Sequence, residues 1–193
     1  VHFPLSNGTQ GVRGMAISPD GRYLAVAHVL SRYQVPTTQL DRGWMNTNAV
    51  TVIDTDEPDK PHPVLLDDPD AGAANPWGVS FSEDGGKLFV THAGTHELSV
   101  IDFPALLERM KREDRSNEPV SERLGFLHGL RTRIALPLNG PRSVASDGKN
   151  VYVAGYFSDS LAEISLKDAC KSRAIPLNVP FRPSREKLGE RYF

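Results

Sequence analysis

Hydrophobic residues occur in short runs along this chain, and one arrangement of two such runs recurs three times. Each copy is an apolar run, a turn containing Asp-Gly, and a second apolar run, at residues 16–28, 79–92 and 144–155. Asp-Gly supplies the backbone conformation that a tight hairpin needs, and the Val, Ile, Tyr and Phe around it favour strands. The pattern therefore predicts three β-hairpins built on one internal repeat.

Two further strand-like segments follow each hairpin. The third segments are residues 49–54, 97–102 and 161–166, and the fourth are residues 63–66, 133–138 and 173–177. Four-stranded units in tandem are typical of the blades of a β-propeller. We therefore predict an all-β fold, a partial propeller of three four-stranded antiparallel blades at residues 12–67, 75–138 and 141–178.

The two ends of the chain change this picture. Residues 1–6 resemble the fourth strands, so we predict that they are the outer strand of a preceding blade and that residues 1–180 form one propeller region. Propellers usually close with four to eight blades. The chain is therefore expected to be an arc of a longer protein, or else one that copies of itself complete. The basic, Pro-containing residues 181–193 are predicted to be a linker and the start of a missing C-terminal module.

Two insertions lengthen the blades, at residues 29–48 and 104–132. The second insertion begins with Leu106, Leu107 and Met110 at helical spacing, which predicts a short surface helix after Asp102.

Composition narrows the class of protein. The 193 residues are 39% hydrophobic and 24% charged with a formal net charge of −2, typical of a globular domain with no field to hold nucleic acid. No apolar run approaches the ~18 residues of a membrane span. The single cysteine, Cys170, excludes an internal disulfide.

Residues 88–102 resemble the YVTN type of propeller repeat, in which a Tyr-Val-Thr-Asn-like strand leads to a Val-Ile-Asp strand. The insertion at 28–48 and the Gly-Glu-Arg-Tyr-Phe ending of residues 185–193 resemble segments of exported bacterial proteins. Those proteins join a YVTN propeller to a di-haem cytochrome c peroxidase-like (MauG-like) module.

The resemblance implies a periplasmic or cell-surface protein whose haem c lies in a missing C-terminal module. The implied partner is that haem module or an electron-transfer protein. The chain itself has no Cys-x-x-Cys-His segment, which covalent haem attachment requires, so no cofactor and no peroxidase residue are expected within it.

Propeller topology places several candidate contact residues on one face, at the mouth of the ring. Trp, Tyr and Arg are the usual anchors of protein interfaces. We predict that the mouth docks a partner, although the loop at 29–48 could instead fold back on its own propeller. The predicted interaction face consists of Arg32, Tyr33, Arg42, Trp44, Trp77, Arg142 and Tyr156.

Histidines at the same face raise a different possibility. His28 and His92 occupy equivalent places in their blades and His96 lies near them, so the three imidazoles could bind a transition metal. Gly155 takes that place in the third copy, and histidines at strand ends are more often structural hydrogen-bonding residues. The acidic segments 54–59 and 67–70 could hold Ca²⁺, although they lack a recognisable loop spacing.

Three functions remain open at this stage. The first is a non-catalytic scaffold or docking domain of an exported redox protein. The second is a metal- or ligand-binding propeller enzyme with its site around His28 and His92, and the third is a cell-surface binding module. No catalytic motif of the common hydrolase, metalloprotease or phosphate-loop kinds occurs in the chain.

Overall fold

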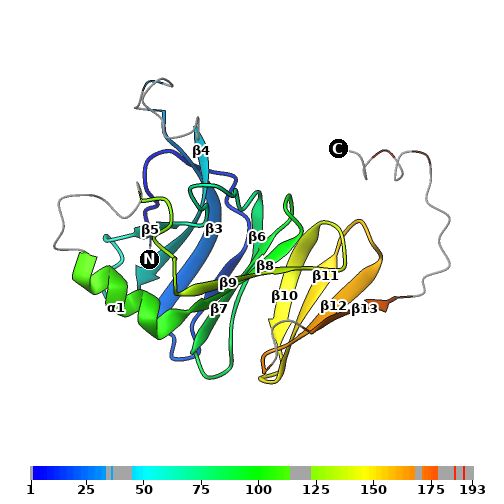
Figure 1. Cartoon of the computed structure of the whole chain (residues 1–193). Helices are drawn as coiled ribbons and strands as arrows, with labels where there is room; N and C mark the ends of the chain where they lie inside the picture. Colours follow the sequence, from blue (N-terminus) through cyan, green and yellow to red (C-terminus); the bar gives the residue numbers. More distant parts are fainter. Residues whose placement is uncertain are drawn as a thin grey trace.

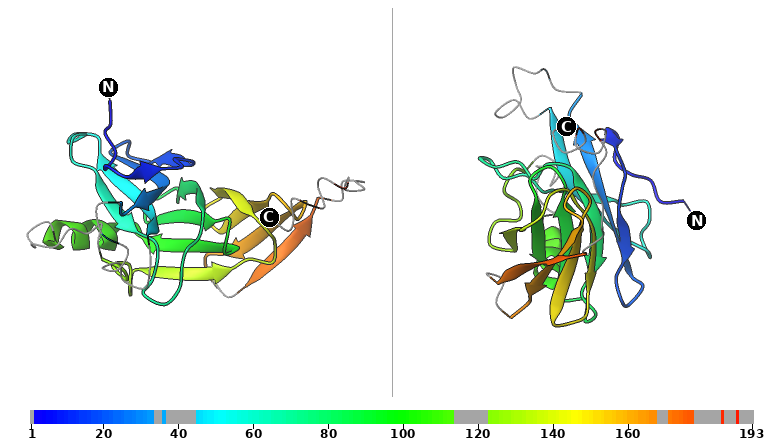
Figure 2. Two further views of the ribbon diagram at one scale, coloured as in Figure 1. Left: turned by 90° about the horizontal axis from the view of Figure 1, so that it is seen from above. Right: turned by 90° about the vertical axis from the view of Figure 1, so that its right-hand side faces the viewer.

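Three antiparallel sheets stand side by side and form the arc of a fan (Figure 1; Figure 2, left). The computed structural model describes residues 2–33, 36, 45–113, 123–167, 171–177, 185 and 189. Each sheet corresponds to one copy of the sequence repeat, which confirms the predicted partial propeller. We call the sheets blade one, blade two and blade three in chain order.

Blade one is built around two long central strands. Its strands are β1 (Thr9–Gln10), β2 (Met15–Ile17), β3 (Tyr23–Ser31), β4 (Asn46–Asp54) and β5 (His62–Leu65). Both β1 and β2 pair with β3, so they form a single inner strand that is interrupted between Gln10 and Met15. The blade therefore begins at Thr9, a few residues before the predicted start at residue 12.

Blades two and three have the predicted four strands in simple sequential order. Blade two consists of β6 (Pro76–Phe81), β7 (Lys87–His92), β8 (Glu97–Asp102) and β9 (Arg131–Ala135). Blade three consists of β10 (Pro141–Ser146), β11 (Asn150–Gly155), β12 (Ser160–Ser165) and β13 (Ser172–Pro176). The Asp-Gly turns form as predicted, with Gly21, Gly85 and Gly148 at φ of 75°, 70° and 83°.

The prediction that residues 1–6 are the outer strand of a preceding blade stays a prediction, because no such blade is among the described residues. Residues 2–6 are irregular and pair with no other described strand. An outer strand is held by a hydrogen-bonded ladder to the third strand of its own blade. No described strand takes that place before blade one, so the segment has nothing to pair with.

The first insertion begins later than the hydrophobic pattern indicates. The β3–β4 pairing continues beyond His28 through Val29↔Asn48 and Leu30↔Thr47 to Ser31↔Asn46. The two strands rise past the rest of blade one at the top of Figure 1. The base of the insertion is therefore a β-ribbon rather than a loop.

Hydrophobic cores lie between neighbouring blades. Blades one and two share a core with side chains such as Ala25, Val52 and Leu88, and blades two and three share one with Phe89 and Val153. The predicted helix, α1 (Phe103–Glu113), extends the first core by burying Leu106 and Met110. Asp102 begins this helix, because its Oδ1 accepts a hydrogen bond of 3.1 Å from the backbone N–H of Ala105.

Candidate functional site at the propeller mouth

Cationic and aromatic side chains from all three blades meet at the mouth. The guanidinium Cζ of Arg13 lies 3.8 Å from the ring centroid of Trp77, and that of Arg142 lies 4.2 Å from it. The Cζ of Arg142 also lies 3.6 Å from the ring centroid of Tyr156. We call these four residues the arginine–aromatic stack. Each contact of this kind contributes about 0.5–2 kcal/mol, depending on its exposure.

Three members of the stack occupy the same position in the three copies of the repeat. Arg13, Trp77 and Arg142 each stand at the start of an inner strand, two residues before Met15, Val79 and Val144. Glycine follows in the first two blades and lets neighbouring backbones approach closely. A Cβ built on Gly14 would lie 2.1 Å from the carbonyl oxygen of Trp77, and one on Gly78 would lie 2.7 Å from that of Arg142.

The turn between β11 and β12 supplies the last aromatic ring. The backbone N–H of Tyr156 donates a 2.9 Å hydrogen bond to the carbonyl of Gly140, which holds the turn over the start of β10. Phe157 packs edge-on against Tyr156, with ring centroids 4.9 Å apart. Blade two has Ala93 and Gly94 in this turn, so the aromatic pair is particular to blade three.

The structure brings together part of the predicted interaction face. Trp77, Arg142 and Tyr156 converge in the stack, whereas Arg32 and Tyr33 lie at the end of the β-ribbon of blade one. The predictions for Arg42 and Trp44 fall outside the described residues. The sequence reasoning did not identify Arg13, although it precedes Gly14 as Trp77 precedes Gly78.

His28 and His92 are buried structural residues, each bonded within or beside its own blade. The Nε2 of His28 lies 2.6 Å from the hydroxyl of Thr51, and the Nε2 of His92 lies 2.7 Å from that of Ser99. The Nδ1 atoms lie 3.1 Å from the carbonyls of Val29 and Ala73, respectively. Because a carbonyl only accepts, each Nδ1 carries the proton and each Nε2 accepts from the hydroxyl.

The third blade supports this structural role. At the two corresponding positions it has Gly155 and Ala162, so the imidazole and its hydroxyl partner are absent together. His96 has a separate role, because its Nδ1 accepts a 3.1 Å hydrogen bond from the backbone N–H of Gly140. Within the described ranges, no three His, Cys, Asp or Glu side chains form a group that could hold a metal ion. The structure thus does not assemble the three histidines into a metal site.

Burial of His92 predicts a loss of stability in mild acid. Burial, together with the charges of Arg131 and Arg133, lowers the pKa of His92 from 6.5 to about 3. In the unfolded chain, His92 is therefore protonated below about pH 6.5, whereas in the folded chain it becomes protonated only near pH 3. This histidine should lower the free energy of unfolding by about 2 kcal/mol between pH 7 and pH 5.

Urea unfolding of the unaltered protein and of His92→Gln at both pH values measures this effect. The difference between the two proteins should shrink by that amount at pH 5. A constant difference between the unaltered protein and His92→Gln would contradict the prediction.

In the acidic segment 67–70, two carboxylates form hydrogen bonds and ion pairs with other groups of the protein. Asp67 is 1% exposed and accepts hydrogen bonds from the backbone N–H of Asn48 (2.6 Å), the side-chain amide of Asn48 (2.8 Å) and the backbone N–H of Ala73 (2.7 Å). Asp68 accepts from Arg131 at 2.5 Å and from Arg133 at 3.1 Å. These two carboxylates are thus occupied by protein donors, which join the segment between blades one and two to β4 and β9.

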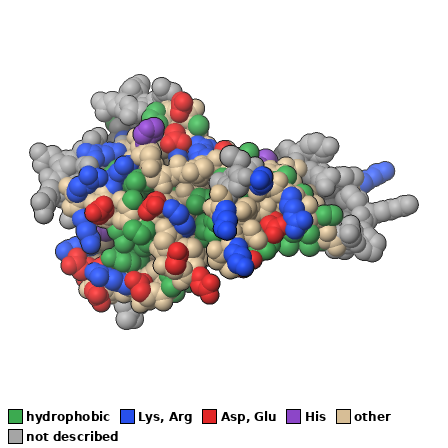
Figure 3. All heavy atoms as spheres, turned by 60° about the horizontal axis from the view of Figure 1, so that its bottom comes forward, with side chains coloured by type: hydrophobic (Ala, Val, Ile, Leu, Met, Phe, Trp, Pro, Cys, Tyr) green, Lys and Arg blue, Asp and Glu red, His purple; other side chains and the backbone are tan. Residues whose placement is uncertain are grey.

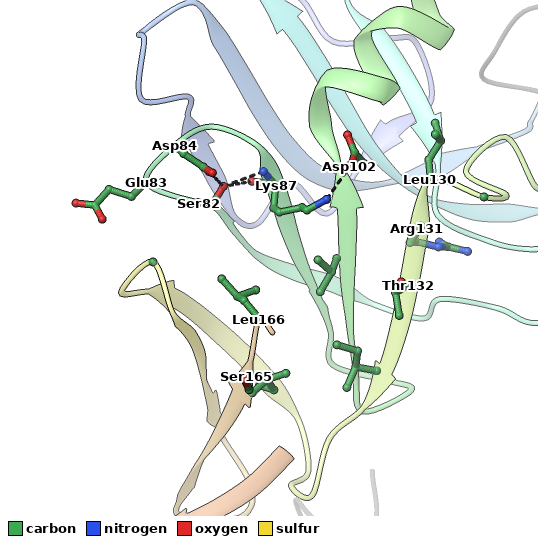
Figure 4. A pocket seen from close by; sticks show the side chains of 15 residues that line it. Ser82, Glu83, Asp84, Lys87, Asp102, Leu130, Arg131, Thr132, Ser165 and Leu166 are labelled. Carbon is green, nitrogen blue, oxygen red and sulfur yellow. Dashed lines mark hydrogen bonds and ion pairs between the residues drawn. The ribbon is translucent and has the colours of Figure 1, made fainter. Parts of the chain in front are cut away.

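A half-open groove of about 1050 Å³ separates the outer parts of blades two and three (Figure 4). Apolar residues such as Val100, Ile134 and Leu166 line it. Ser82, Asp84 and the Lys87–Asp102 ion pair lie at the end nearest the Asp-Gly turns. The groove arises because inner strand β10 contacts β6 and β7 while the outer strands diverge. No sequence motif marks it, since it exists only between two sheets.

The surface near the Asp-Gly turns carries charges of both signs. Figure 3 views the molecule from the side of the Asp-Gly turns and shows acidic and basic side chains interspersed over that surface. Across the residues that the structure covers, no helix is long and apolar enough to cross a membrane.

Fold and site together define an arc of a β-propeller whose mouth carries a cation–aromatic stack and in which His28 and His92 are buried structural residues. No protein-family model matches the chain. The chain is 29% identical over 160 residues to hydrazine synthase subunit beta of Kuenenia stuttgartiensis. The aligned region covers 81% of this chain and 41% of that protein.

Solved structures give a consistent result. A chain of Kuenenia stuttgartiensis hydrazine synthase superposes with a TM-score of 0.72 at 28% identity, covering 82% of this chain and 46% of that one. A streptogramin B lyase structure superposes with a TM-score of 0.56 at 14% identity, covering 92% of this chain and 44% of the lyase, and shows the fold alone. The chain thus spans less than half the length of these proteins. The YVTN repeat type and the fusion to a haem module stay predictions.

Proposed function

We propose that this chain is a propeller region of a multi-subunit redox complex and that it serves the complex as a non-catalytic scaffold. The observation that carries the proposal is the similarity to hydrazine synthase subunit beta, in sequence and in fold, over four-fifths of the chain. The structural role of His28 and His92 supports a scaffold over an enzyme with its site at these histidines, because both ring nitrogens of each are occupied.

The docking surface in this proposal is the mouth, where the arginine–aromatic stack lies. Its partner is a haem-containing protein or a haem module of the same protein, located in the periplasm or at the cell surface. In this proposal haem c is attached outside this chain, because the one cysteine of the chain cannot complete a Cys-x-x-Cys-His segment.

Isolation of the native assembly tests the proposal. The protein should be purified from its source cells without denaturation and examined by native mass spectrometry and visible absorption. We expect an assembly with haem absorption, whereas this chain produced alone should show none and should hold no stoichiometric metal. Recovery of the native protein as a single species without haem would contradict the proposal.

A further inference from the structure

We propose that Arg13 and Arg142 in the arginine–aromatic stack bind carboxylates of an acidic segment of the partner protein. The inference rests on the proposed function for the origin of that partner. It adds the chemistry by which the mouth recognises the partner and the residues that do so.

Arg13 and Arg142 have no ion pair with a described carboxylate. Arg22, Arg131, Arg133 and Arg173 each form an ion pair with a carboxylate, whereas across the described part of the chain Arg13 and Arg142 form none. The Nε of Arg142 is also buried without a hydrogen-bond partner there. Among the described residues, these two neighbouring cations thus have no carboxylate partner.

Stacking prepares these cations for a carboxylate. The N–H groups of a guanidinium lie in its plane, and they match the two oxygens of a carboxylate. The Cζ of Arg142 lies 4.2 Å from the ring centroid of Trp77 and 3.6 Å from that of Tyr156, so two rings hold its guanidinium in place. The rings also restrict the long arginine side chain before binding, which reduces the conformational entropy that binding removes.

The same geometry disfavours a nucleic acid. Proteins that bind single strands offer open aromatic faces for bases and a continuous basic groove for the backbone. Here Trp77 stacks with guanidinium groups from blades one and three, and Tyr156 with one. The net charge of −2 supplies no wider basic field. An acidic protein segment, which needs only a few well-placed cations, therefore fits the site better.

Neutral substitutions at the mouth test the inference in the native complex. The dissociation constant of the assembly should be measured by mass photometry on dilution for Arg13→Gln, Arg142→Gln and the double variant. Lys149→Gln is the matched control, because it removes one positive charge at the exposed Asp-Gly turn at the other end of blade three. We expect each mouth variant to weaken assembly about tenfold, which corresponds to about 1.4 kcal/mol, and the control to leave it unchanged.

Competition gives a second readout that does not depend on how the variants fold. Decaglutamate should release the partner from the unaltered complex, and decaglutamine should not. An effect of Lys149→Gln equal to that of the mouth variants would overturn the inference, as would release by both peptides or by neither, or release only by a single-stranded oligonucleotide. If the complex assembles but ignores these changes, the inference fails and the scaffold function stands. If no complex exists, the proposed function itself fails.

Discussion

Asp67→Ala is expected to lower the free energy of unfolding by about 4 kcal/mol, because it removes a buried acceptor from three donors at once. The carboxylate accepts from two groups of Asn48, at 2.6 and 2.8 Å, and from the backbone of Ala73, at 2.7 Å. The side chain is 1% exposed, so the three donors lie away from bulk water when their acceptor is removed. Urea unfolding at pH 7 measures the loss.

Asp70→Ala is the matched control, since it removes an exposed carboxylate from the same acidic segment and should change stability by less than about 0.5 kcal/mol. Asp67→Asn should fall between the two, because the amide oxygen can still accept. Equal stabilities of the Asp67→Ala and Asp70→Ala variants would show that the buried hydrogen bonds of Asp67 contribute little to stability.

Gly14→Ala is expected to cost about 3 kcal/mol through overpacking of two backbones. The new Cβ would lie 2.1 Å from the carbonyl oxygen of Trp77, so β2 or β6 must shift. That shift separates Arg13 from Trp77, and the indole environment should change with it. Urea unfolding measures the first effect, and near-ultraviolet circular dichroism measures the second.

Ser143→Ala tests the explanation directly. Ser143 occupies the position of Gly14 and Gly78 in blade three, it is exposed, and it already carries a Cβ. Its substitution should leave stability within about 0.5 kcal/mol of the unaltered protein. A small effect of Gly14→Ala, similar to that of Ser143→Ala, would refute the close approach as the reason for glycine.

The repeat was readable in the sequence because local chemistry and global fold agree in it. Asp-Gly turns and β-branched runs specify hairpins without help from distant residues, and α1 shows its helical spacing just after Asp102. Residues 2–6 have similar strand chemistry but form no strand, because a strand also needs a neighbour. Local pattern therefore predicted the blades well, whereas the outer strand at residues 1–6 stays a prediction.

Propeller topology predicts which residues share the mouth, but it does not predict what each side chain does there. Loops that share one face brought Trp77, Arg142 and Tyr156 together in the prediction, but the choice between metal ligands and structural histidines required coordinates. The hydroxyl partners of His28 and His92 are Thr51 and Ser99, on the neighbouring strand and diagonally across from each histidine. Because Thr and Ser are not common metal ligands, the metal hypothesis did not consider them. The groove between blades two and three depends on how two sheets diverge, which no single segment encodes.

The inner strand of blade one has a consequence for association. Met15 and Ile17 are 71% and 57% exposed, whereas Phe81, which corresponds to Ile17 in blade two, is 9% exposed because blade one covers it. The two ends of the arc are therefore unlike. Blade one exposes a face that a preceding blade would cover, and blade three exposes the opposite face, which would cover a following blade. Association through such faces is heterologous, so copies of the isolated arc would add head to tail rather than form a two-fold dimer.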